Sequence, residues 1–117
     1  MTDQVISCFL VDRDDDGPVI SGPSQVPTAG LPDGDVEITV EYSSLNYKDA
    51  LAAGGHPGVV RRFPHVPGID AAGTVVVSDD PALPIGSAVL VTGYELGAPR
   101  WGGWAERVRV PRDWVHR

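Results

Sequence analysis

Four consecutive residues, Asn46-Tyr47-Lys48-Asp49, have side chains that could carry chemistry. They include the only Asn and the only Lys of a 117-residue chain in which Arg outnumbers Lys eight to one. A Tyr phenol can donate a proton or hydrogen-bond a developing oxyanion, and an Asn amide can orient a cofactor or a water. The alternative is a helix N-terminus, with Asn46 as the cap and Asp49 complementing the helix dipole. The sequence leaves both interpretations open.

Two adjacent arginines, Arg61 and Arg62, are the next candidates and lie close to a run of Pro and Gly. The planar guanidinium group can bind a phosphate or a carboxylate through two parallel hydrogen bonds. A pair of arginines in a solvated loop needs no ligand, and the pair taken alone favours that second interpretation.

The motifs predict neither a metal site nor a nucleotide site. His56, His65 and His116 do not have the spacing of metal ligands, and Cys8 is the only cysteine. A single cysteine also excludes a disulfide within the chain. The sequence contains neither G-x-G-x-x-G nor G-x-x-x-x-G-K-[ST], so it lacks a complete dinucleotide-binding unit.

The composition is that of a globular protein with an excess of acidic residues. Twelve Asp and four Glu against nine basic residues give a formal net charge of −7. This charge argues against a nucleic-acid groove or an anionic membrane surface as a partner. No basic segment followed by a long apolar run marks a signal peptide, and no segment reaches the apolar length of a membrane span. We therefore expect a cytoplasmic protein.

One strand is expected to deliver the chain to the candidate residues. Between residues 36 and 42, apolar and polar side chains alternate, which predicts a strand with one apolar face. Residues 47–53 follow as a short helical turn that ends at Gly54-Gly55. Residues 69–77 form the next predicted strand, and the small residues 71–73 leave room for a ligand or another backbone.

The rest of the pattern predicts a single, mainly β domain. Strands separated by Gly and Pro turns, with almost no helix, indicate a barrel or a sandwich. A chain of 117 residues fits one domain. The other predicted strands are residues 5–11, 88–92 and 104–110, together with a brief return strand at Val19 and Ile20 before an irregular connection over residues 21–30.

Three segments of the chain read SSLNYKDALAAGG, VVRRFPHVPGIDAAGTVVVS and GSAVLVTGYELGAPRWGGWAERVRVP. They resemble the N-terminal part of medium-chain dehydrogenases/reductases, and more narrowly the zinc-free quinone oxidoreductase and acrylyl-CoA reductase group. The match runs from about Leu31 to the end of the chain. The resemblance implies a GroES-like, partly open β-barrel with one or two short helical turns. In this family a Rossmann domain that binds NADPH and a C-terminal return segment follow. Residues 1–117 are therefore predicted to be an incomplete GroES-like catalytic domain.

The resemblance also bears on the cofactors. Asn46 stands where zinc-dependent relatives have a Cys ligand, and Gly68-Ile69-Asp70 stands where they have Gly-His-Glu. Both departures imply a catalyst without zinc. The implied cofactor is NADPH in the intact protein. The 117 residues alone are not expected to bind it tightly, because they lack the phosphate-binding turn.

The implied activity is hydride transfer from NADPH to an activated alkene, such as acrylyl-CoA or another enoyl thioester, or to a quinone. The resemblance implies two catalytic residues: Tyr47 as the donor near the reacting centre, and Asp70, which would contact the same cleft or hold Lys48. Asn46 and Lys48 would lie against the cofactor. Arg62 would assist with an anionic group of the small-molecule substrate or of the cofactor.

A function of another class stays open, namely a stand-alone GroES-like module that binds a partner without catalysis. Its contact residues would be Trp101, Trp104 and Trp114. An exposed sheet edge would bind a partner or a second copy, which would make a homodimer. A reading frame that continues past Arg117 into a glycine-rich Rossmann turn would favour the reductase.

Overall fold

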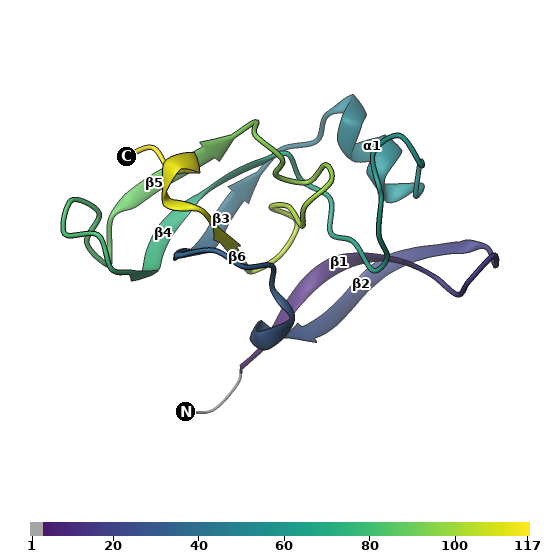
Figure 1. Cartoon of the computed structure of the whole chain (residues 1–117), viewed down its shortest axis with the longest axis horizontal. Helices are drawn as coiled ribbons and strands as arrows, with labels where there is room; N and C mark the ends of the chain where they lie inside the picture. Colours follow the sequence, from purple (N-terminus) through teal and green to yellow (C-terminus); the bar gives the residue numbers. More distant parts are fainter. Residues whose placement is uncertain (1–3) are drawn as a thin grey trace.

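The computed structural model describes residues 4–117, which form two antiparallel β-sheets and one short α-helix (Figure 1). Strands β1 and β2 form a two-stranded ribbon, and the larger sheet has the strand order β5-β4-β3-β6. The sheets do not close on themselves, so the predicted mainly β, partly open fold is confirmed. The elements in chain order are β1 Val5–Arg13, β2 Val19–Pro27, β3 Val36–Ser43, α1 Tyr47–Ala53, β4 Asp70–Ser78, β5 Ala88–Thr92 and β6 Arg107–Val110, with 3-10 turns at Thr28–Gly30 and Arg112–Trp114.

The ribbon of β1 and β2 is longer than the sequence predicted. The pairing is continuous, from the Val19–Arg13 pair beside the turn to the Pro27–Val5 pair at the open end. The prediction of an irregular connection over residues 21–30 is therefore wrong for most of that stretch. Proline is tolerated in β2 because, within the described sheets, this strand pairs with β1 only, and an edge strand needs fewer backbone donors.

Strand β3 lies inside the larger sheet and confirms the predicted alternation over most of its length. Val36 and Ile38 are each 1% exposed and pack in the main hydrophobic core with residues of β4, β5 and β6. The alternation fails at the end of the strand, where Tyr42 is 74% exposed. A register shift against β4 between Val40 and Tyr42 accompanies this change. The strand therefore ends in an exposed segment just before the candidate residues.

Residues 104–106 connect the ribbon to the larger sheet instead of extending β6, which begins only at Arg107. Glu106 donates its backbone N–H to the Ser7 carbonyl, and its carboxylate accepts the Ser7 backbone N–H. Its carbonyl accepts the backbone N–H of Val40 in β3 at 2.8 Å. The carboxylate bond to Ser7 gives a structural role to the acidic side chain that interrupts the apolar pattern here.

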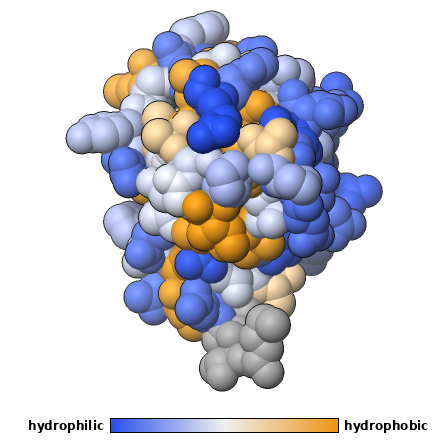
Figure 2. Space-filling view, turned by 90° about the vertical axis from the view of Figure 1, so that its left-hand side faces the viewer, coloured by the Kyte–Doolittle hydropathy of each residue, from blue (hydrophilic) through white to orange (hydrophobic). Residues whose placement is uncertain are grey.

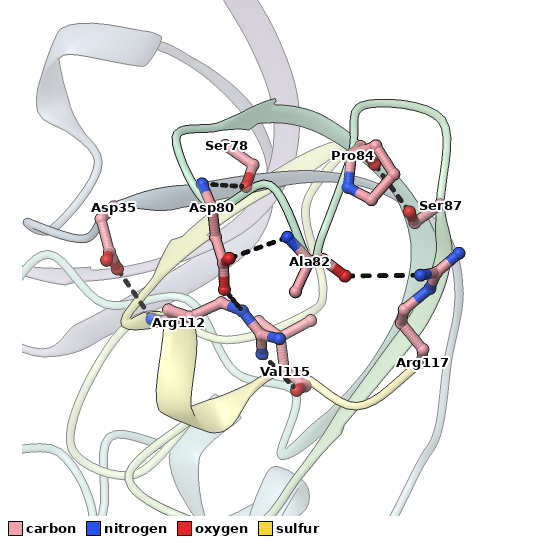
Figure 3. A network of polar contacts seen from close by, with 9 residues as sticks. All are labelled: Asp35, Ser78, Asp80, Ala82, Pro84, Ser87, Arg112, Val115 and Arg117. Atoms are coloured by element: carbon pink, nitrogen blue, oxygen red, sulfur yellow. Dashed lines mark hydrogen bonds and ion pairs between the residues drawn. The ribbon is translucent and has the colours of Figure 1, made fainter.

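The loop between β4 and β5 is fastened to the C-terminal segment by polar contacts (Figure 3). The Arg112 Nε contacts the Asp80 carboxylate at 2.7 Å, and the Arg112 backbone N–H donates to Asp35 at 2.7 Å. The Arg117 guanidinium donates to the Ala82 carbonyl at 3.3 Å. The C-terminal segment is thus held at the end of the molecule away from α1 (Figure 1).

The face seen in Figure 2 shows apolar groups set among hydrophilic side chains. In β4, in β5 and in the loop between them, the large exposed apolar residues are Val77, Ile85 and Leu90. Exposed apolar residues of this kind are common on protein surfaces, so they need no special explanation. Across residues 4–117, no helix combines the length and the apolar character that a bilayer crossing requires.

Candidate active site

Helix α1 begins and ends where its sequence predicts. Asn46 precedes it in an extended conformation, with φ −127° and ψ 168°, as an N-cap residue requires. The Asp49 carboxylate accepts the Asn46 backbone N–H at 2.9 Å, which is the returning bond of a capping box. Gly55 has φ +72° just past the helix, a conformation that favours glycine. The helix therefore holds Asn46 and Tyr47 in place at the end of the segment that leaves β3.

Asp49 does more than cap the helix, because its side chain is fully buried. One carboxylate oxygen accepts the backbone N–H groups of Gly68 and Ile69 at 3.1 and 2.9 Å, while the other serves Asn46. Three backbone donors therefore converge on one buried carboxylate. The bonds tie the start of α1 to the start of β4, where Asp70 lies. The sequence signal for this role was the N-x-x-D spacing, which predicts the cap but not the long-range bonds.

Asn46 and Asp70 meet beside this tether. The Asn46 Nδ2 lies 3.4 Å from an Asp70 carboxylate oxygen, and Ser44 bridges the two residues. The Ser44 hydroxyl donates to the same Asp70 oxygen at 2.7 Å and accepts the Asn46 amide N–H at 2.8 Å. Ser44, Asn46 and Asp70 thus form one hydrogen-bonded cluster, called the polar cluster below. The sequence analysis did not predict the part of Ser44, because no motif links it to Asp70.

A glycine-rich loop supports the polar cluster from the other side. The Trp104 indole N–H donates to the Ser44 carbonyl at 2.9 Å. Gly68 has φ +112°, and a Cβ built there would lie 2.6 Å from the Gly103 nitrogen. A Cβ on Gly103 would lie 2.4 Å from the Asp70 carbonyl. The backbones approach so closely that only glycine fits at both positions.

Tyr47 and Lys48 are exposed beside the polar cluster. Tyr47 is 80% exposed, and its neighbour Leu45 is 75% exposed. Within residues 4–117, neither the Tyr47 phenol nor the Lys48 ammonium forms a hydrogen bond or an ion pair. Asp70 therefore contacts Ser44 and Asn46 rather than Lys48. The two exposed side chains are available to a ligand or to another part of the protein.

Arg62 lies away from the polar cluster in a cavity of its own. That cavity, called the arginine cavity below, has a volume of about 290 Å³. None of its described lining residues belongs to the polar cluster or to α1; they are Pro32, Arg62, Phe63, Pro64, His65, Pro99, Arg100 and Trp101. The structure thus brings together Asn46 and Asp70 of the predicted site, keeps Tyr47 and Lys48 beside them, and separates Arg62.

The described part of the chain contains no set of side chains arranged to bind a metal ion. Residues 4–117 contain no group of three or more His, Cys, Asp or Glu side chains that could hold a metal ion. His65 is buried, and burial lowers the pKa of its imidazole even though it also contacts the Gly97 carbonyl. Cys8 is buried as well, and burial raises the pKa of its thiol.

The mainly β, partly open architecture is that of a GroES-like domain. The alcohol dehydrogenase GroES-like domain family matches residues 32–117, and the chain belongs to that family. The family predicted from the sequence is confirmed.

The chain is also similar to parts of longer proteins. Acrylyl-CoA reductase AcuI of Ruegeria pomeroyi is 41% identical over 112 residues, covering 95% of this chain and 34% of that protein. The structure of Escherichia coli K-12 YhdH with bound NADPH matches with a TM-score of 0.86 and 45% identity, over 93% of this chain and 33% of that one. The structure of Bacillus subtilis YhfP with NAD bound matches with a TM-score of 0.87 and 41% identity, over 97% of this chain and 34% of that one. The chain thus spans about a third of the length of these relatives.

Proposed function

We propose that the intact protein carrying this domain is an NADPH-dependent oxidoreductase that reduces an activated alkene, such as acrylyl-CoA or another enoyl thioester, or a quinone. The observation that carries the proposal is the polar cluster of Ser44, Asn46 and Asp70 beside an exposed Tyr47. The similarity to an acrylyl-CoA reductase and to a protein with bound NADPH supports it. The domain would supply one wall of the active site.

The exposed residues near the polar cluster fit the nicotinamide end of NADPH. The Asn46 amide offers both donor and acceptor atoms, which suit a carboxamide or a ribose hydroxyl. The Lys48 side chain has no partner within the described residues and remains available to an oxygen of the cofactor. Leu45 and Tyr47, both largely exposed, offer apolar surface against which a flat ring can lie. Asn46 and Lys48 are therefore the residues proposed to contact the cofactor.

When bound, NADPH supplies the hydride that the β-carbon of the alkene accepts. The electron pair of the alkene then moves toward the thioester oxygen, and the α-carbon must gain a proton. The Tyr47 phenol can hydrogen-bond the developing oxyanion or donate that proton. Asp70 would act on the site by orienting the Asn46 amide directly and through Ser44. Arg62 would contact an anionic group of the substrate at a distance from the reacting bond.

The experiment that tests the proposal measures NADPH oxidation at 340 nm by the intact protein. Acrylyl-CoA, crotonyl-CoA and a benzoquinone are offered in parallel. Oxidation with a thioester or with the quinone is the expected result, and the relative kcat/KM values identify the preferred class. If none of the three is reduced while the intact protein binds NADPH, the proposal is wrong. The domain would then serve binding rather than catalysis.

A further inference from the structure

The arginine cavity has a charge that contrasts with the rest of the chain. The formal net charge of the chain is −7, yet Arg62 and Arg100 both line this cavity. None of the described residues that line it is acidic. Ion pairs in residues 4–117 occupy four other arginines, namely Arg13, Arg107, Arg109 and Arg112. The cavity is therefore a local cationic site that attracts an anion.

The two arginines differ in how firmly they are held. Arg100 donates to the Asp33 carbonyl, and its guanidinium lies 5.2 Å from the Trp114 ring centroid. Arg62 is exposed and forms neither a hydrogen bond nor an ion pair with the described residues. The Arg100 guanidinium is thus held in place by Asp33 and Trp114. Arg62 has its guanidinium free to close on an anionic ligand.

The walls of the cavity are flat, apolar and held in place. Apart from the two arginines, the lining consists of Phe63, Trp101, His65 and three prolines. The Trp101 indole N–H donates to the Pro64 carbonyl at 3.0 Å, and the His65 Nε2 lies 2.9 Å from the Gly97 carbonyl. Such walls suit a flat ring, and little ordering cost remains on binding. The expected ligand therefore combines a heteroaromatic ring with a phosphate.

The volume of the cavity restricts the ligand further. About 290 Å³ lies at the lower limit of small-molecule sites, which span roughly 300–1,000 Å³. The space holds one ring system and its sugar, so the phosphates would lie at the rim, where Arg62 is exposed. A whole dinucleotide or a whole acyl-CoA would not fit. The remainder of a larger ligand must extend out of the cavity.

We propose that the arginine cavity binds the nucleotide end of a coenzyme A thioester, with the ring against Trp101 and Phe63 and the phosphates toward Arg62 and Arg100. This inference deepens the proposed function and rests on it for the choice of nucleotide. The family resemblance places the NADPH-binding Rossmann domain after these residues. Among the proposed substrates, an enoyl thioester of coenzyme A is then the other molecule that carries a phosphorylated adenosine.

The test is an NMR titration of the ¹⁵N-labelled 117-residue chain with adenosine 3′,5′-bisphosphate, which reproduces the nucleotide end of coenzyme A. The reporter is the Trp101 indole N–H, assigned with a Trp101→Phe variant. We expect a saturable shift of this signal. Arg62→Gln is expected to weaken binding by about tenfold, because a charge-assisted hydrogen bond to phosphate is lost. Arg61→Gln is the matched control, since Arg61 is exposed but does not line the cavity.

Adenosine 2′,5′-bisphosphate, inorganic phosphate and adenosine form the comparison titrations. Stronger binding of the 3′,5′ compound than of all three supports the proposal. Equal or tighter binding of the 2′,5′ compound, which reproduces the adenosine end of NADPH, would overturn the assignment to the substrate. An equal response to inorganic phosphate would show that the cavity binds anions without selecting a nucleotide, and this would also overturn the assignment. A Trp101 signal that does not move, or equal effects of Arg61→Gln and Arg62→Gln, would also contradict it.

The titration separates this inference from the proposed function, because it involves neither NADPH nor turnover. If the intact protein reduces enoyl thioesters but the chain does not bind the 3′,5′ compound, only the assignment of the cavity is wrong. If the chain binds it but the intact protein reduces no substrate, the reductase proposal is wrong. The site for a phosphorylated nucleotide then stands without a link to catalysis.

Discussion

A carboxylate oxygen of Asp49 accepts the backbone N–H of Ile69 at 2.9 Å. This bond crosses from helix α1 to the residue before β4, and the same carboxylate also serves Gly68 and Asn46. Because Asp70 follows Ile69 directly, the position of Asp49 determines how close Asp70 comes to Asn46. A residue that touches no substrate in the proposed reaction therefore shapes the polar cluster.

Replacing Asp49 by Ala is expected to destabilise the chain by about 3 kcal/mol or more, because three backbone donors lose a fully buried acceptor. Asp49→Asn keeps one acceptor oxygen for Gly68 and Ile69 and should cost less. Urea unfolding measures both changes. Asp79→Ala, at an exposed position, is the control and should stay within about 0.5 kcal/mol of the parent chain. Equal effects at Asp49 and Asp79 would contradict the role of the tether.

Tyr47→Phe tests the proposed donor. Because Tyr47 is 80% exposed, the substitution should change the free energy of unfolding by no more than about 0.5 kcal/mol. In the intact enzyme, kcat for NADPH-dependent reduction should fall by about 10² or more, the usual contribution of a positioned acid. Tyr42→Phe is a matched control, since Tyr42 is 74% exposed and lies outside the polar cluster. An unchanged rate in Tyr47→Phe would exclude the phenol as donor.

NADPH is expected to show no measurable binding to the 117-residue chain in isothermal calorimetry. The sequence has no glycine-rich turn to bind the pyrophosphate, so only the contacts of the nicotinamide end remain. The intact protein serves as the positive control. A dissociation constant in the micromolar range for the chain alone would show that it holds a complete cofactor site.

The contacts of Asp80 predict a dependence of stability on pH. The Ala82 backbone N–H and the Arg112 guanidinium lower the pKa of the Asp80 carboxyl in the folded chain below its ordinary value of 3.8. A lowered folded-state pKa means that the unfolded chain binds the proton more readily. The contribution of Asp80 is therefore present above about pH 3.8 and is lost as the pH falls through the lowered pKa.

Asp80→Asn removes this titration, so the loss of stability on acidification should become shallower than in the parent chain. Urea unfolding at a series of acidic pH values measures the difference. Asp79→Asn is the control, because Asp79 is exposed and its removal shows how the loss of any one carboxylate changes the pH dependence of stability. If the two variants show the same pH dependence, the Arg112 and Ala82 contacts do not stabilise the folded chain.

Local signals predicted much of the secondary structure. Residues 47–53 and 88–92 form α1 and β5 with the predicted bounds, because each is delimited by caps, glycines or a short apolar run. The length of β2 was not predictable in this way. Its Pro and Gly residues indicate a loop, and only the pairing with β1 over its full length makes it a strand. Pairing between strands depends on the partner, which a local pattern does not contain.

The candidate site also has features that local sequence predicts and features that depend on the tertiary structure. The sequence by itself determined that a helix begins after Asn46, that Tyr47 and Lys48 follow at its start, and that the chain resembles a GroES-like domain. Only the tertiary structure decided that Asp70 meets Asn46, 24 residues earlier, rather than Lys48, and that Arg62 lies in a separate cavity. The physical reason is that capping and turn chemistry act between neighbours in the chain. The meeting of Asn46 and Asp70 depends on a buried carboxylate whose three partners come together only when the fold is complete.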